Sequence, residues 1–428
     1  MVETTEMAIK SMDSQLRNVL SDTPEADRGK LISVCLKSIP NRMNFIEGVT
    51  FVSVLSKMGV VDINNIANDQ IDFENDGQDS DKYCIRDTWC DCTIDTDGRI
   101  TELDIMHDDE HEYDLPAIIA LFERLTCLTL YNCRSLPVEL SNLPHLENLY
   151  LYSIDLDLLE NFPIQMKLKN LKELCVDRDS SLPVPSQFLK WMRTQLPSLE
   201  VLRYCTNGKT DVSFIIDSLR TNDVCFYNSL KHLELHGCLM EQDSFEILML
   251  EIVPKFRDLK SLNLQNNNIK SFLPIVDSIK NDTTFVPSKS LRVLNLNRND
   301  VLEKMEDDPI EKAALLCLLG TFNAIDNVVG GPVDFLDDSD VEYALRINHA
   351  GRRIVVKVDG GSNNDDDGKA IVPISLWPVI LERAYEKSCD THDSAWESEK
   401  EKTKKKKKSA TGIYYLLREV GPALLFGG

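Results

Sequence analysis

Apolar residues in the middle of this chain recur in a short frame, with leucine or another apolar residue at its first, fourth and sixth positions. The frame occurs seven times, and its copies begin at Leu125, Leu146, Leu171, Leu199, Leu230, Leu259 and Leu291. Successive first leucines are 21, 25, 28, 31, 29 and 32 residues apart. Apolar and polar residues that alternate over a few positions predict a half-buried strand. Because no single unit can bury its own leucines, we expect neighbouring units to stack as parallel strands.

The residues between two strands must return across the back of the sheet. Where the first leucines are 28 or more residues apart, the return segment is long enough for a helix. The segment 240–256 has the clearest helical stripe, formed by Phe245, Leu248, Met249, Ile252 and Phe256.

The chain turns after a strand at Cys133, Cys238, Asn267 or Asn299. An asparagine side chain can hydrogen-bond the backbone at such a turn, whereas a cysteine fills the same position as a small apolar residue. The repeat therefore predicts an α/β fold, a curved leucine-rich-repeat solenoid. Parallel strands would line its concave face, and helices or irregular segments would cover its convex face.

The longer intervals resemble the intracellular class of leucine-rich repeat, as in ribonuclease inhibitor, and the first two are shorter and more irregular. Upstream, the segment from Trp89 to Ile105 resembles the junction between cap and first repeat in plant-type leucine-rich repeats. Asp97-Gly98 suits a tight hairpin turn. Ile100, Leu103 and Ile105 would then supply the opening strand.

Three phrases beyond the repeats are INHAGRR at 347–353, SLWPVILERAY at 375–385 and TGIYYLLREVGPAL at 411–424. Together with the repeats they resemble a large family of leucine-rich-repeat proteins from diatoms. That family is largely uncharacterised, so the resemblance implies architecture and little chemistry.

We divide the chain into four regions, with helical regions at both ends. They are a helical N-terminal region at 1–70, an acidic linker and cap with the first strand at 71–114, the solenoid at 115–330, and a C-terminal cap or helical region at 331–428 with a lysine-rich loop at 389–409. The first region carries an apolar stripe formed by Ile9, Met12, Leu16, Val19 and Leu20.

The charge of the chain restricts its partners. The 428 residues carry a formal net charge of −23. Binding of nucleic acid requires Lys and Arg that displace counterions, so we expect no nucleic-acid partner and no anionic membrane partner. A basic protein is the expected partner. Between Asp72 and Asp114 there are 16 acidic and 3 basic residues, which we interpret as a solvated cap surface, with a binding tail as the alternative.

The expected location is cytoplasmic. No apolar run reaches the length of a membrane span, and the first residues do not follow the pattern of a secretion signal. We therefore expect reduced cysteines, and doubt disulfides at Cys84, Cys90 and Cys92. The run Lys404–Lys408 leaves open a nuclear location, a disordered insertion, or pairing with the acidic belt of the same chain.

The candidate binding residues flank the inner leucines, because alternate side chains of a strand point to opposite faces. We predict that a partner binds at Tyr131, Tyr150, Tyr152, Asp177, Arg203, Glu234, His236, Gln265, Asn295 and Asn297. Tyrosine suits an interface because it combines apolar area with a hydrogen-bonding tip. The alternative is that the tyrosines pack against the cap or against each other.

Metal chemistry has weak support in the sequence. His232, Glu234 and His236 alternate along one strand beside Cys205, but strand residues two apart are about 6.8 Å from each other, which is awkward for a compact zinc site. The segment 93–104 imitates a calcium loop, although a hairpin turn explains the same residues. We expect no metal and no cofactor.

No nucleophile elbow, phosphate-binding loop, dinucleotide fingerprint or zinc-protease motif occurs in the chain. We therefore predict a non-enzymatic scaffold that binds a partner protein on the concave face. The alternative is a regulator of an enzyme, resembling the leucine-rich-repeat activators of small GTPases. A third possibility is a self-assembling module, and the oligomeric state stays open.

Overall fold

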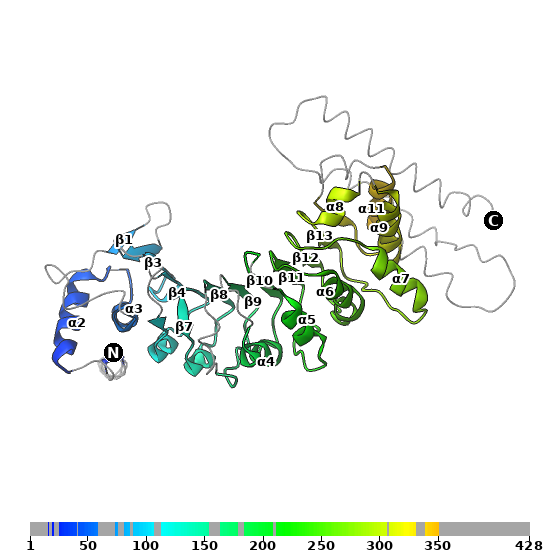
Figure 1. The fold of residues 1–428 in the computed structure, drawn as a ribbon. Coiled ribbons are helices and arrows are strands. Elements are labelled where there is room, and N and C mark those ends of the chain that lie inside the picture. The colour runs from blue at the N-terminus through cyan, green and yellow to red at the C-terminus, as the bar shows by residue number, and fades with distance from the viewer. Residues whose placement is uncertain are drawn as a thin grey trace, which may run out of the picture. The chain divides into compact units, whose positions relative to one another are not determined.

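The computed structural model in Figure 1 has a mixed α/β fold in which most strands are parallel. It describes residues 16, 19–20, 25–40, 42–58, 73–75, 81–85, 89–106, 113–153, 163–178, 184–208, 211–305, 308–330 and 339–350. The chain divides into two compact units. Unit 1 is Met1–Thr210 with Asp217–Leu230, and unit 2 is Asp211–Ile216 with Lys231–Gly428.

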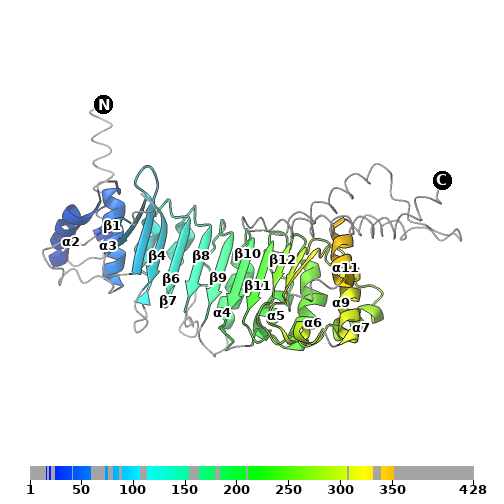
Figure 2. The ribbon, with the colours of Figure 1, turned by 90° about the horizontal axis from the view of Figure 1, so that it is seen from above.

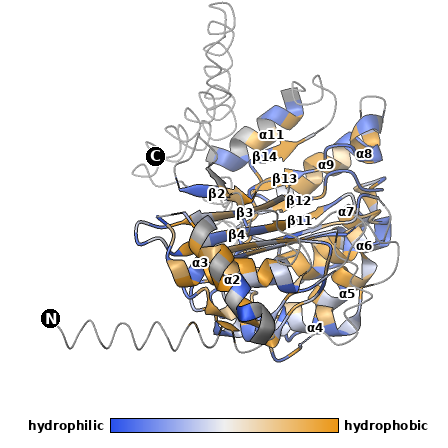
Figure 3. Cartoon of the chain, turned by 90° about the vertical axis from the view of Figure 1, so that its left-hand side faces the viewer, coloured by the Kyte–Doolittle hydropathy of each residue, from blue (hydrophilic) through white to orange (hydrophobic). Residues whose placement is uncertain are grey.

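Two helices, α2 (Glu25–Ser38) and α3 (Phe45–Lys57), begin the described part of unit 1. The Asn44 side chain starts α3 by accepting hydrogen bonds from the backbone N–H groups of Ile46 and Glu47, at 3.0 and 3.4 Å. Most of α3 is buried, and its many apolar residues are orange in Figure 3, although the polar residues Glu47, Thr50 and Ser53 are buried as well. Of the predicted apolar stripe, Val19 and Leu20 are buried, while Ile9 and Met12 lie outside the described residues.

The sheet of unit 1 begins antiparallel and continues parallel. Strands β1 to β4 form antiparallel pairs, and from β4 onward each strand is parallel to the next (Figure 2). In spatial order the strands are β1 (Phe73–Asn75), β2 (Lys82–Ile85), β3 (Trp89–Ile94), β4 (Ile100–Met106), β6 (Cys127–Tyr131), β8 (Asn148–Tyr152), β9 (Glu173–Asp177) and β10 (Val201–Cys205). Two short strands, β5 (Tyr113–Asp114) and β7 (Cys133–Ser135), pair separately.

The predicted opening strand is confirmed as β4, and the structure adds β1 and β2, which the sequence pattern does not predict, and β3, which precedes the predicted hairpin turn. These strands lie in the acidic stretch that we interpreted as cap surface. Cys90, Cys92 and Ile94 alternate inward on β3, so acidic residues between them can remain on the other side of the sheet.

The predicted hairpin turn between β3 and β4 is also confirmed, and it docks on α3. Asp95 Oδ1 accepts hydrogen bonds from the backbone N–H groups of Asp97 and Arg99, so this carboxylate shapes the turn. Gly98 has φ +74°, and a Cβ atom there would lie 2.2 Å from the Arg42 carbonyl oxygen. Arg99 Nη1 is 3.0 Å from Oε1 of the buried Glu47.

The inner residues of the repeat frame form the core. The second and fourth residues of β6 and β8 are leucines that face each other in register and are fully buried. In β10 the fourth residue is Tyr204 instead of leucine, and its hydroxyl lies 3.5 Å from Nη1 of the buried Arg178. Aligned burial of these side chains holds successive strands together.

The return segments follow the predicted dependence on interval length. The first short return contains the 3-10 helix η3 (Val138–Asn142), which follows η2 (Ala117–Leu121) before the first repeat strand. Each described return of 28 or more residues contains an α-helix. They are α4 (Ser186–Gln195), α5 (Ser213–Arg220), α6 (Gln242–Ile247) and α7 (Leu273–Asn281).

In unit 2 four parallel strands follow each other in order: β11 (His232–His236), β12 (Ser261–Asn263), β13 (Val293–Asn295) and β14 (Asn327–Val329). The stripe of the segment 240–256 is fully buried as predicted, but the helix is not regular. After α6 it continues as the π-helix η5 (Leu248–Ile252) and the 3-10 helix η6 (Val253–Lys255). Pro254 lacks the N–H that a longer α-helix would require.

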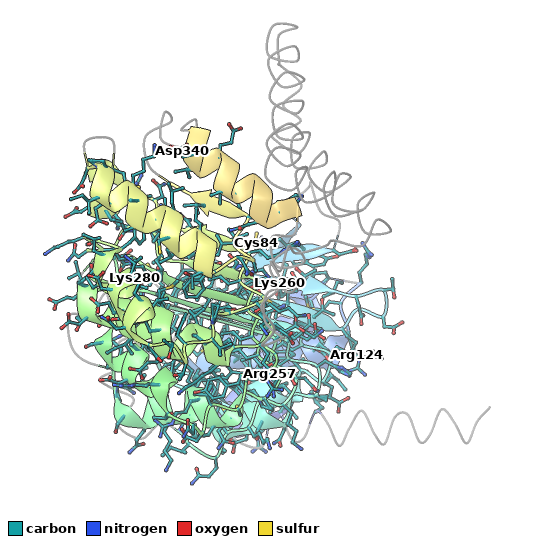
Figure 4. The ribbon with its side chains drawn as sticks, turned by 90° about the vertical axis from the view of Figure 1, so that its right-hand side faces the viewer. Cys84, Arg124, Arg257, Lys260, Lys280 and Asp340 are labelled. Atoms are coloured by element: carbon teal, nitrogen blue, oxygen red, sulfur yellow. The ribbon has the colours of Figure 1, made fainter. Side chains whose placement is uncertain are left out.

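Helices α8 (Asp300–Lys304), α9 (Pro309–Thr321) and α11 (Ser339–Ala350) complete the described part of unit 2. On α11, Asn348 donates hydrogen bonds to the carbonyl oxygens of Leu319 and Ile325, at 2.9 and 2.7 Å. Asp340, labelled in Figure 4, accepts from Lys312 of α9 at 3.0 Å. The beginning of the INHAGRR phrase therefore fastens α11 to the last repeat, while the two later phrases and the lysine run lie outside the described residues.

Two asparagines connect neighbouring turns in unit 2. Asn267 donates to the carbonyl oxygens of Leu235 and Leu264, and accepts from the N–H groups of Cys238 and Met240. Asn299 bonds its neighbouring turn in the same way. At the equivalent positions Cys133 and Cys238 are buried, as predicted for a small apolar residue.

Replacement of Asn267 by alanine is expected to lower the free energy of unfolding by about 3 kcal/mol, because four buried backbone groups would lose their partner. The matched control is Asn268→Ala, since Asn268 is exposed, and its effect should stay below about 0.5 kcal/mol. Urea unfolding followed by circular dichroism measures both. Equal losses for the two variants would contradict the role given to Asn267.

Candidate functional site

The outward face of unit 1 is formed by the side chains that alternate with the buried ones on β3, β4, β6, β8, β9 and β10. From β4 onward, where neighbouring strands lie side by side in parallel (Figure 2), the register places equivalent residues next to each other. One row across the sheet consists of Asp91, Asp104, Thr129, Tyr150, Cys175 and Arg203. The next row contains Tyr131, Tyr152, Asp177 and Cys205.

The three predicted tyrosines form a stack on this face. Tyr131 lies opposite Tyr152, with ring centroids 4.8 Å apart and planes inclined by 24°. Tyr150 lies 6.4 Å from Tyr152, with planes inclined by 14°. The predicted cluster is therefore confirmed, and so is the expectation that the rings could pack against each other. All three side chains remain partly exposed.

The tyrosine hydroxyls are neutral hydrogen-bond donors at physiological pH. Burial, helped by the negative charge of Glu173, raises the pKa of Tyr150 to about 12. Burial also raises the pKa of Tyr152 well above its ordinary value. The Tyr150 hydroxyl lies near the Glu173 carboxylate, and the Tyr152 hydroxyl lies near the Cys175 thiol.

The predicted charged residues of this face are already engaged. Arg203 forms an ion pair with Glu173, which sequence reasoning missed. Asp177 accepts a hydrogen bond from Asn207 at 3.4 Å. Glu173 occupies the first outward position of β9, which is equivalent to the position of Cys127 on β6. The repeat frame therefore already indicated that the Glu173 side chain lies on the outward face.

Asp104 on β4 is a second residue that the sequence did not single out. It lies opposite Asp91 of β3, whose carboxylate binds Lys82 at 3.0 Å. Asp104 Oδ1 is buried and has no hydrogen-bond partner among the described residues. Burial, with a further contribution from Asp91, raises the pKa of Asp104 to about 6, although Lys82 opposes this shift.

The predicted residues of unit 2 lie on the outward side of their strands. Some of them hydrogen-bond the backbone of their own strand, and others keep partly exposed side chains. Glu234 and His236 are half-buried on β11, and Glu234 lies opposite Asn263 of β12. Asn295 Oδ1 accepts from the backbone N–H of Asn297 at 3.0 Å, so Asn295 shapes the end of its own strand. Asn263 does the same for Gln265 at 3.1 Å. Asn297 and Gln265 keep partly exposed side chains.

In the described part of the chain, no group of three His, Cys, Asp or Glu side chains is arranged to hold a metal ion. The cysteines near the β3–β4 hairpin, Cys84, Cys90 and Cys92, are free thiols. Among the described helices none has both the length and the apolar character needed to cross a membrane.

Comparison with known proteins gives no family: no family model and no curated protein matches the chain. Among solved structures it is similar to human 5T4 (Wnt-activated inhibitory factor 1, trophoblast glycoprotein), with 15% identity and a TM-score of 0.37 over 66% of this chain and 93% of that one. It is also similar to the PEPR1–AtPEP1 structure, with 17% identity and a TM-score of 0.31 over 67% of this chain and 38% of that one. Both are leucine-rich-repeat proteins.

The raised pKa of Asp104 predicts a pH-dependent effect of its removal. Because the native pKa of about 6 exceeds the ordinary 3.8, the native state binds this proton more tightly than the unfolded state does. The contribution of Asp104 to stability is therefore most favourable below about pH 4 and is lost as the pH rises to about 6. The asparagine of the Asp104→Asn variant does not ionise, so this variant does not lose stability in this way as the pH rises.

We expect Asp104→Asn to gain stability relative to the wild type as the pH rises from about 4 to about 7. Urea unfolding at several pH values measures the difference. Glu123→Gln, at an exposed position of the same unit, has the same change in net charge and serves as the control. A difference between wild type and Asp104→Asn that is independent of pH would contradict the assignment.

Proposed function

We propose that this chain is a leucine-rich-repeat recognition scaffold, and that it binds a partner protein without catalysing a reaction. The outward face of unit 1 is the proposed binding surface. The stack of Tyr131, Tyr150 and Tyr152 supports this proposal more than any other observation, because it leaves large aromatic side chains partly exposed on the outward face of the sheet.

The stack has the properties of an interface anchor. Tyrosines restrained by their neighbours lose little conformational entropy when a partner covers them. The rings of Tyr131 and Tyr150 both stack on Tyr152, which restrains the ring positions before binding. The leucines on the other side of the same strands are fully buried, so the strands form a rigid support for the surface.

The proposed partner is a basic protein. The chain carries a net charge of −23, and the tyrosines have Asp104 on one side and Glu173 and Asp177 on the other. Complementary charge accelerates association, and salt weakens it. The residues Glu234, His236, Gln265, Asn295 and Asn297 stay a prediction for the face of unit 2. A reducing, cytoplasmic location is part of the proposal, since described cysteines such as Cys35 and Cys238 are buried free thiols.

The test is affinity capture from a matched cell extract with the full-length chain and with a Tyr131→Ala, Tyr150→Ala, Tyr152→Ala variant. The control is Leu121→Ala with Val138→Ala, because these exposed apolar residues lie in η2 and η3 of the same unit, outside the strands. Mass spectrometry identifies the partner, and its dissociation constant is then measured at low and high salt.

We expect the tyrosine variant to weaken binding at least about tenfold, because buried aromatic anchors dominate interface energies, and the control to change it by less than about threefold. Circular dichroism must show that both variants are folded. A partner retained equally by all three proteins would refute binding at the tyrosine stack. A dissociation constant that does not change with salt would refute the basic partner.

A further inference from the structure

A row of charged residues lies where the chain enters the strands of unit 2. Lys231, Lys260 and Arg292 each follow the first leucine of a repeat frame, and Asp326 occupies the equivalent position before β14. From Lys260 onward, each backbone N–H donates to the carbonyl oxygen of the preceding member, at 2.7, 2.8 and 3.0 Å. The row therefore places three cations next to each other and ends on one anion.

The equivalent row in unit 1 alternates in charge. Its members Glu147, Lys172 and Glu200 are connected by the same backbone hydrogen bonds, and Lys172 Nζ binds Glu147 Oε1 at 2.7 Å. Like charges that lie opposite each other on neighbouring strands are destabilising. The fold of unit 2 therefore gains no stability from its three adjacent cations, whereas a bound anion would offset their repulsion.

Further cations lie beside this row. Arg257 and Lys289 stand two residues before the first leucine of their frames, which are equivalent positions of neighbouring repeats. Both are exposed, as are Lys260 and Arg292, while Lys231 is half-buried. Figure 4 labels Arg257 and Lys260. We call these five residues the basic edge.

Most of the charge of the basic edge is not neutralised by the described carboxylates around it. Arg257 and Lys260 form no ion pair with a described residue, although the exposed Asp258 stands between them in the sequence. Arg292 Nε lies 3.7 Å from Asp326 Oδ2, which is also 3.0 Å from His349 Nδ1, and the Arg292 side chain is 47% exposed. This edge is therefore locally positive in a chain whose net charge is −23.

We propose that the basic edge binds an acidic segment of a second partner protein. This surface goes beyond the proposed function, because it belongs to unit 2 and takes a partner of the opposite charge. Lysine and arginine donate charge-assisted hydrogen bonds to the carboxylates of the segment. Neighbouring strands are about 4.8 Å apart and an extended chain advances about 3.3 Å per residue, so a run of about four acidic residues spans the three cations of the row.

A short acidic segment fits this edge better than nucleic acid or an anionic membrane does. Both of these present many charges over a large surface, so they are repelled by the net negative charge of the whole chain. Charges interact over about 10 Å at 0.1 M salt, so a short segment senses mainly the cations that it contacts.

The test uses the full-length chain and a labelled peptide with four consecutive glutamates between Gly-Ser flanks, with the corresponding glutamine peptide for comparison. Fluorescence anisotropy gives the dissociation constants at low salt. The test variant is Arg257→Gln with Lys260→Gln. The matched control is Lys270→Gln with Arg298→Gln, because these exposed residues follow β12 and β13, at the end where the chain leaves the strands.

We expect the test variant to weaken binding of the glutamate peptide by about tenfold, because two charge-assisted contacts are removed, and the control to weaken it by less than about twofold. The glutamine peptide should bind at least about tenfold more weakly than the glutamate peptide. Equal weakening by the two double variants, or equal binding of the two peptides, would overturn the proposal.

Urea unfolding separates binding from a structural role of the same cations. Because adjacent like charges do not stabilise the fold, the test variant should unfold at the same urea concentration as the wild type or at a higher one. A lower midpoint together with weaker binding would mean that these cations support the fold, and the proposal would be wrong.

Three further results concern the occupant. Tighter binding of tetrathymidylate than of the glutamate peptide would assign the edge to nucleic acid and refute the proposal. A tenfold gain in affinity when Asp365, Asp366 and Asp367 are replaced by asparagine would mean that this acidic run of the same chain occupies the edge, which also refutes it. The tyrosine variant of unit 1 should bind the glutamate peptide as the wild type does, and a loss there would contradict a separate surface.

Discussion

The structure depends on the in-register stacking of one short apolar frame. Each strand is too short to be stable alone, and its leucines are covered only when the next strand lies beside it. Because the register is parallel, the same alignment that buries Leu128 against Leu149 places Tyr131 against Tyr152 on the outward side. The arrangement of the proposed binding surface is therefore a direct result of how the core is packed.

A ladder of parallel turns also needs partners for backbone groups where the chain leaves each strand. Asn267 and Asn299 supply them between neighbouring turns, and Asn348 bonds two carbonyl oxygens of the last repeat from a helix. At the other end, the β3–β4 hairpin is fastened to α3 by Arg99 and Glu47. Both ends of the described repeats are thus closed by specific side-chain contacts as well as by apolar packing.

Most of the charged side chains named on the outward face of unit 1 have a partner within the chain. Arg203 is paired with Glu173, Lys82 with Asp91, and Asp177 accepts from Asn207. Asp104 differs, since burial holds its pKa at about 6 and its Oδ1 lacks a hydrogen-bond partner among the described residues. An acidic net charge spread over many residues favours association with a basic protein without fixing the position of contact.

The sequence by itself determined the repeat, the strands, the long helical returns, the turn at Asp97-Gly98 and the cluster of tyrosines. All of these follow from spacing, because alternate positions of a strand face opposite sides and regular intervals place equal positions side by side. Sequence reasoning missed β1, β2 and the π-helical return after α6. Only the tertiary structure decided that Asn295 serves its own strand, that Arg203 is neutralised by Glu173, and that Asp104 lies opposite Thr129. Such pairings depend on which side chains meet across strands, and the spacing within one strand does not contain that information.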